Sequence, residues 1–188
     1  MGVPRDIVVA DYDPEWPAWF EAVCRRVWPV IDDIALRIDH VGSTAVPGLA
    51  AKPIIDMDIV VAADEGVRRV IDRLAASGYR WCGDLGVRGR EAFEPTRDEG
   101  LPAHHLYLVV EKNRAHADHW LLRDVLREDG EARARYAALK RRNAELAGGD
   151  MEVYVAAKAR FVAELLTRAR AERGLPAVTY WNPDVPVR

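Results

Sequence analysis

The sequence predicts an α+β fold, in which a small mixed sheet with one crossing helix is followed by a helical C-terminal half. Residues 54–61 form an apolar, β-branched run that is typical of a buried strand. Residues 64–77 repeat apolar side chains at helical spacing, and the pattern from residue 115 is helical almost to the C-terminus. Strands grouped before helices in this way favour an α+β arrangement.

The N-terminal elements come first. Residues 7–10 are β-branched and predict an edge strand. Asp13 and Pro14 predict a helix start, with the aspartate as N-cap and the proline at the first helical position. Pro29 is expected to bend or end this helix. Its predicted buried face carries Trp16, Phe20, Val23, Val27 and Ile31.

The remaining elements follow from the same signals. Further strands are predicted at residues 37–41, 79–82 and 104–110, and residues 83–102 predict hairpins or a mobile loop. Helices are predicted at about 115–127, 130–146 and 151–172. We therefore expect an α/β core at 1–112, a helical region packed on it at 113–173 and an irregular tail at 174–188, together one compact domain.

Composition limits the function classes. The chain has 188 residues, 49% hydrophobic and 30% charged, with a net charge of -3, which fits a globular protein and gives no strong nucleic-acid signal. No segment approaches the length of a membrane span or a signal peptide, so we expect no membrane partner and a cytoplasmic location. Cys24 and Cys82 are expected to be free thiols. The oligomeric state stays open.

Asp56 and Asp58 are the first candidate site residues. Side chains alternate along a strand, so both carboxylates point to one face of the predicted strand. An Asp-x-Asp pair alone is compatible with the wet face of an amphipathic strand. Aspartate is depleted in strands, however, and its neighbours here are apolar. Two carboxylates this close favour a bound cation, and Mg²⁺ or Mn²⁺ is the expected metal.

Gly42, Ser43 and Thr44 are the second candidate set. A glycine followed by small hydroxyl residues at a strand end lets backbone amides approach a phosphate, and the hydroxyls add donors. Gly-Ser-Thr alone is usually a turn. Between two predicted strands and followed by Asp-x-Asp, it predicts a phosphate-plus-metal site.

The stretch from His40 to Asp58 (HVGSTAVPGLAAKPIIDMD) resembles the signature of the GrpB-like family, whose members look like nucleotidyltransferase-superfamily proteins. The resemblance continues at residues 104–107, 122–127 and 136–140 and at Tyr154, Lys158 and Phe161. It implies a nucleotidyltransferase-like sheet with flanking helices. It also implies that Gly42 and Ser43 hold a nucleoside triphosphate and that Asp56 and Asp58 bind the metal.

The family pattern places a third carboxylate on a neighbouring strand, and this sequence departs from it. The corresponding strand reads AHHLYL, and alternation puts His105 and Tyr107 on one face and the apolar side chains with His104 on the other. His105 is therefore the histidine expected at the site, as a metal ligand or a general base.

The other candidates are weaker. Lys52 is placed to neutralise phosphate, or is simply exposed. The helical half is locally basic, which fits solvated helix faces; Arg123 and Lys158 are the residues we expect to face a cleft. His116 and His119 share a helix face, but without a third ligand they predict no zinc site.

Three functions remain open at this point. The first is a metal-dependent protein that binds a nucleoside triphosphate and transfers a nucleotidyl group to an unidentified small or macromolecular acceptor. The second is a non-catalytic nucleotide-binding or partner-stabilising module, since GrpB-like domains resemble segments fused to dephospho-coenzyme A kinases. The third is a metal-dependent phosphohydrolase that uses His105.

Overall fold

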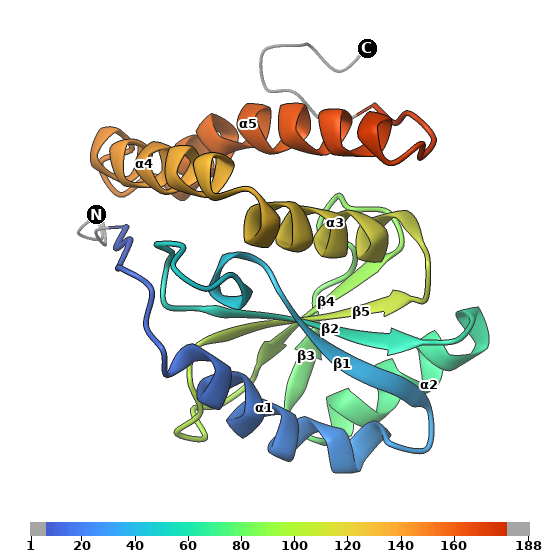
Figure 1. Cartoon of the computed structure of the whole chain (residues 1–188). Coiled ribbons are helices and arrows are strands. Elements are labelled where there is room, and N and C mark those ends of the chain that lie inside the picture. The colour runs from blue at the N-terminus through green and yellow to red at the C-terminus, as the bar shows by residue number, and fades with distance from the viewer. Residues whose placement is uncertain (1–6, 180–188) are drawn as a thin grey trace.

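A five-stranded mixed sheet forms the centre of the computed structural model, which describes residues 7–179 (Figure 1). The strand order is β1-β2-β5-β4-β3. Only the β2 and β5 pair is parallel; the other neighbours are antiparallel. The strands are β1 (Ala35–Val41), β2 (Ile55–Val61), β3 (Tyr79–Trp81), β4 (Arg90–Pro95) and β5 (His104–Val110).

Helices cover both faces of this sheet. Helices α1 (Trp16–Ile31) and α2 (Asp64–Ala76) lie on one face, and α3 (Arg114–Glu128), α4 (Gly130–Leu146) and α5 (Met151–Glu172) lie on the other (Figure 1). The predicted α+β class is confirmed. In the described residues no helix is long and apolar enough to cross a bilayer.

The main core lies between the sheet and α1 and α2. Met57 and Ile59 of β2 and Leu106 of β5 point into it and are fully buried. Trp16, Val23, Val27 and Ile31 supply the α1 side, as the helical spacing predicts. Because alternate residues of β2 are committed to this core, Asp56 and Asp58 face the side covered by α3, α4 and α5.

Several predicted boundaries are wrong. Residues 7–10 form no strand; Ala10 makes one isolated bridge to Ala51. Helix α1 begins at Trp16, and Asp13 instead accepts a hydrogen bond from the amide of Glu15 in the turn before it. Pro29 lies inside α1, which ends two residues later.

The segment 83–102 contains β4, which pairs with β3 as a hairpin and with β5. This fits the hairpin alternative rather than the loop. Beyond α5, residues 175–179 have no regular structure, and the rest of the predicted irregular tail, residues 180–188, lies outside the described residues. Cys24 and Cys82 are free thiols.

Candidate functional site

The two aspartates of β2 differ sharply in exposure. Asp58 is fully buried, whereas 30% of the Asp56 side chain is exposed. In the strand register, Asp56 lies opposite Val41 of β1 and His105 of β5, and Asp58 lies opposite Asp39 and Tyr107. Residues directly opposite each other share a face, so β5 brings its histidine to the exposed aspartate.

His105 is hydrogen-bonded to Asp56. Its Nδ1 lies 2.9 Å from the Oδ1 of Asp56, and 46% of the His105 side chain is exposed. Burial raises the pKa of Asp56, but the hydrogen bond and charge of His105 outweigh it, and the pKa falls below its usual value. The carboxylate therefore stays ionised at neutral pH. With Nδ1 donating to Asp56, Nε2 is the ring nitrogen left to accept a proton.

Asp58 has a different histidine partner, one that the sequence argument did not assign to the site. His119 of α3 places its Nδ1 2.9 and 3.1 Å from the two carboxylate oxygens of Asp58. Burial lowers the pKa of His119, but the hydrogen bond and charge of Asp58 outweigh it, and the pKa is raised. The i,i+3 spacing of His116 and His119 was the available signal, since it put both rings on the α3 face that packs on the sheet.

Gly42 lets the loop after β1 lie against Asp56. Its backbone adopts φ 70° and ψ -166°, a region that essentially only glycine occupies. A Cβ at this position would stand 2.2 Å from the Oδ2 of Asp56, which is closer than any real contact. The next residue, Ser43, begins the short 3₁₀ helix η1 (Ser43–Ala45). The glycine is thus required both by its torsion and by the close approach to Asp56.

Two lysines from the helical half lie near the site, Lys140 at the loop and Lys158 in the electrostatic surroundings of Asp56. Lys140 of α4 is 2% exposed, and its Nζ donates to the Oγ of Ser43 at 3.0 Å. Burial and the nearby charge of Lys158 lower the pKa of Lys140 to about 7, although Asp56 acts in the opposite direction. Lys158 of α5 is half-buried, and burial lowers its pKa while the charge of Asp56 raises it. Lys140 is a second site residue that sequence reasoning missed.

Two other predicted residues, Thr44 and Lys52, are engaged by partners other than the two aspartates. Thr44 is buried, and its hydroxyl is hydrogen-bonded to the Nε2 of His40 at 3.0 Å, so it is engaged within the loop. Lys52 lies near Tyr154 and Met151, with its Nζ 5.9 Å from the Tyr154 ring centroid and 3.6 Å from the Met151 sulfur.

Arg123 is engaged by groups other than Asp56 and Asp58. It stacks on the Trp120 ring at 4.3 Å, pairs with Asp124 and donates to the backbone carbonyl of His40 at 3.2 Å. The structure therefore brings Lys158, and not Arg123 or Lys52, into the electrostatic surroundings of Asp56.

The carboxylates of Asp56 and Asp58 suit a hard divalent cation that takes only part of its coordination shell from the protein. Across the described residues, no three His, Cys, Asp or Glu side chains are placed to hold a metal together. Mg²⁺ needs just one or two carboxylates, because phosphate oxygens and water complete its octahedral shell. Asp56, which lies beside Gly42 and is 30% exposed, fits that requirement. Asp58 fits less directly, since both of its oxygens face His119.

Solved structures with similar folds include one close match in length and others that match in part. A crystal structure of GrpB from Enterococcus faecalis superposes with a TM-score of 0.77 and 27% identity, covering 89% of this chain and 99% of that one. The Cid1 poly(U) polymerase superposes with a TM-score of 0.51 and 15% identity, covering 69% of this chain and 43% of that one. The second likeness shows a nucleotidyltransferase-like fold and nothing further.

Comparison of sequences points to the same family as the GrpB crystal structure. A UPF0157 protein of Halalkalibacterium halodurans is 35% identical over 88% of this chain and 83% of its own length. A dephospho-CoA kinase of Mycolicibacterium paratuberculosis is 32% identical over 84% of this chain, which corresponds to 44% of that relative. The family model described as GrpB protein matches residues 6–168. The chain therefore belongs to the GrpB family, and its fold matches that of the GrpB crystal structure.

Proposed function

We propose that this protein binds a nucleoside triphosphate with a divalent cation at Asp56 and transfers its nucleotidyl group to a hydroxyl acceptor. The observation that carries the proposal is the buried cation beside the Gly42–Ser43 loop. Among the described residues Lys140 forms no ion pair, and its one hydrogen bond goes to Ser43. Its Nζ also lies 4.5 Å from the Tyr136 ring centroid, but no carboxylate pairs with it among these residues. A buried ammonium group without an anionic partner is costly, so a polyanion is the ligand that this arrangement favours.

Each residue has a separate role in this proposal. The amides of Gly42 and Ser43, with Lys140 and Lys158, hold the phosphates on the β1 side of Asp56. Mg²⁺ held at Asp56, with Asp58 behind it, would neutralise the charge that develops on the phosphates. His105 accepts the proton of the incoming hydroxyl at Nε2, and Asp56 orients its ring through Nδ1.

A specific observation favours a second candidate, a nucleotide-binding module without turnover. Both carboxylate oxygens of Asp58 are hydrogen-bonded to His119, and the described residues contain no group of three His, Cys, Asp or Glu side chains that could bind a metal together. Some relatives are named dephospho-CoA kinase, and this chain spans less than half the length of the one compared above. An accessory nucleotide-binding role in longer proteins would need the phosphate and metal site but not the proton acceptor.

Calorimetry and pyrophosphate release together test both candidates. Titration with ATP, GTP, CTP and UTP, with and without Mg²⁺, is expected to show metal-dependent binding of at least one of them. The Lys140→Met variant should lose at least tenfold in affinity, whereas Lys112→Met, on the turn after β5, should bind like the wild type.

Pyrophosphate release then separates the two functions. Release with a bound nucleotide supports transfer, binding without release supports the accessory role, and release of inorganic phosphate supports hydrolysis. Unchanged nucleotide affinity in Lys140→Met would contradict the proposed site.

A further inference from the structure

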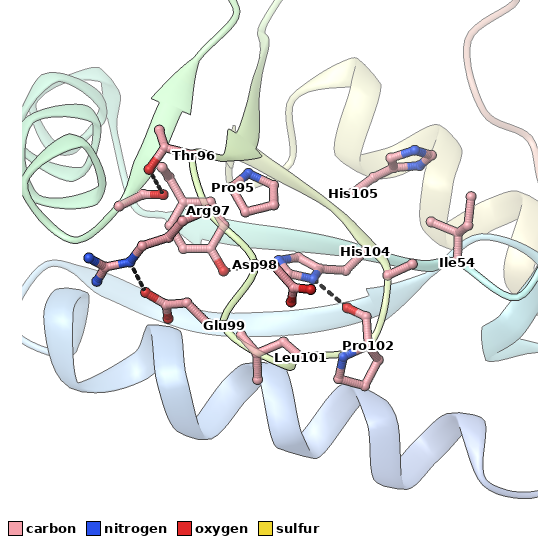
Figure 2. Close-up of a pocket in the computed structure, with 13 residues that line it drawn as sticks. Ile54, Pro95, Thr96, Arg97, Asp98, Glu99, Leu101, Pro102, His104 and His105 are labelled. Carbon is pink, nitrogen blue, oxygen red and sulfur yellow. Dashed lines mark hydrogen bonds and ion pairs between the residues drawn. The ribbon is translucent and has the colours of Figure 1, made fainter.

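A cavity of about 560 Å³ opens at the edge of the sheet, at the start of β5. Its wall is built by the chain between β4 and β5, residues 95–103, together with Ile54 and Tyr79. His105 also lines it, and the same residue reaches Asp56 through Nδ1. In Figure 2, His105 and Ile54 lie at one end of the cavity, and Thr96 and Arg97 lie at the other.

Most of this cavity lies on the α1 and α2 face of the sheet, where Tyr79 contacts His104, and only its Ile54 and His105 end lies beside Asp56, at the start of β2 and β5. The Gly42–Ser43 loop follows β1, and His105 belongs to β5, so in the strand order the two lie on opposite sides of β2. In a transfer reaction the attacking and leaving oxygens are roughly in line through the phosphorus. With pyrophosphate leaving toward Ser43 and Lys140, in-line attack brings the hydroxyl from the β5 side, which the cavity reaches at its His105 end.

The polar atoms inside the cavity are already paired with one another. The hydroxyl of Tyr79 lies 2.9 Å from Nε2 of His104, and Nδ1 of His104 lies 2.8 Å from the carbonyl oxygen of Pro102. Burial lowers the pKa of His104, which fits a neutral ring that donates to Pro102 and accepts from Tyr79. What remains available to a ligand is mainly apolar: ring faces and the side chains of Ile54, Leu101 and the prolines.

Two of the three acidic and basic side chains of the outer wall, Glu99 and Arg97, pair with each other, and the third, Asp98, accepts a hydrogen bond from the Gly100 amide at 2.8 Å. Glu99 is bound by Arg26 of α1 at 2.6 and 3.2 Å and by Arg97 at 2.8 Å. Thr96 is fixed by its hydroxyl and its amide to the carbonyl of Gly78. The wall is thereby tied to α1 and to the turn before β3. No lysine lines the cavity, and Arg97 is paired, so the cavity is poorly suited to a triphosphate.

We infer that this cavity holds the acceptor of the transfer reaction, a small molecule with a flat apolar body and a hydroxyl group. The inference rests on the proposed function and adds the class of acceptor. A volume in this range encloses a compact organic molecule rather than a polymer chain. Its hydroxyl oxygen forms a bond to the α-phosphorus, the bond from that phosphorus to the bridging oxygen breaks, and pyrophosphate leaves. The hydroxyl proton passes to Nε2 of His105.

The test uses benzyl alcohol as the probe, because it combines a flat ring with a hydroxyl. Two-dimensional NMR of the full chain is expected to show saturable shifts at Ile54 and Leu101. Leu101→Trp and Ala103→Trp are each expected to weaken probe binding at least tenfold by filling the cavity. The matched control is Leu146→Trp, at an exposed leucine at the end of α4, and thermal melts establish that each variant is folded.

Calorimetry with ATP and Mg²⁺ on the same variants gives the second readout. The acceptor assignment is supported if the two cavity variants lose affinity for benzyl alcohol but keep an affinity for ATP within twofold of wild type. Absence of probe shifts at the cavity residues overturns it. The assignment is also overturned if both cavity variants, but not Leu146→Trp, lose binding of ATP as well as of benzyl alcohol. The cavity would then hold the nucleoside.

Failure of the proposed function has a different signature. If the wild type binds none of the four nucleoside triphosphates with Mg²⁺, the proposed function fails and the acceptor assignment falls with it. Probe shifts at Ile54 and Leu101 would still identify the cavity as a ligand site.

Discussion

Replacing Gly42 by alanine should damage the site in a way that can be worked out from the backbone. The glycine has φ 70° and ψ -166°, and an alanine forced into such a region costs about 1–3 kcal/mol. Its Cβ would also meet the Oδ2 of Asp56 at 2.2 Å, so the loop or the carboxylate must retreat by about 0.8 Å to reach even the shortest realistic contact of 3.0 Å. A displacement of this size at a reacting centre can cost about 10²-fold.

Gly48→Ala is a matched control for this change. Gly48 also has positive φ, 78°, but the nearest atom to its added Cβ is the Nε of Arg133 at 3.9 Å. Both variants therefore place an alanine at positive φ, which strains the backbone, and only the Cβ of Gly42→Ala clashes with Asp56. Since 1 kcal/mol shifts the melting temperature of a chain of this size by about 2–4 °C, both should melt lower, by up to about 10 °C.

The assay is calorimetric titration with a nucleoside triphosphate and Mg²⁺, alongside thermal melting. Gly42→Ala is expected to lose on the order of 10–100-fold in affinity, and Gly48→Ala is expected to bind within about twofold of wild type. Equal binding by the two variants would refute the argument, because it would mean that the contact between the loop and Asp56 has no part in holding the ligand.

Four further predictions concern the charged groups of the site. Asp56→Ala should abolish metal-dependent nucleotide binding in calorimetry, and retained binding would place the metal elsewhere. His105→Ala should keep nucleotide binding but lose pyrophosphate release, and equal loss of both would make the histidine a ligand rather than a proton acceptor. Burial holds the pKa of Lys140 at about 7, so at pH 8 nucleotide binding should take up about one proton, detected in buffers of different ionisation enthalpy and absent in Lys140→Met. The raised pKa of His119 means that its pairing with Asp58 stabilises the fold below about pH 6.5 and that this contribution is lost as pH rises through the raised value; His119→Gln should therefore melt lower than wild type at pH 6 and close to it at pH 9.

The parts of the fold that the sequence predicted well depend on local pattern. Strand β2 and helices α3, α4 and α5 have continuous periodicity and clear end signals, so they could be placed within one or two residues. Strand β4 could not be placed as a single strand, because its sequence REAFEP is polar and is held by pairing with β3 and β5. Local propensity carries no information about such pairing.

The same distinction applies to the site. The proximity of His105 to Asp56 follows from strand alternation and the expectation that the two strands are neighbours. The contact between Lys140 and Ser43 joins residues 97 positions apart, and that between His119 and Asp58 joins residues 61 apart. Both depend on how α3 and α4 cross the sheet. Helical spacing shows which side chains share a face but not which strand that face covers.

Helix α3 determines which carboxylates of the sheet remain accessible. The sheet carries a third aspartate on the same face, because Asp39 of β1 lies in register opposite Asp58. Its Oδ2, however, accepts from His116 at 3.1 Å, Trp120 at 3.1 Å and Arg37 at 3.2 Å, and only 10% of its side chain is exposed.

Helix α3 thus engages two of the three carboxylates, Asp39 through His116 and Trp120, and Asp58 through His119. Asp56 is left as the most exposed of the three. A single accessible carboxylate holds Mg²⁺ weakly on its own, since most of the shell must come from other oxygens. The phosphates held at Ser43 and Lys140 would supply those oxygens. Metal and nucleotide should therefore bind together, each depending on the other, rather than as a metal site that is filled first.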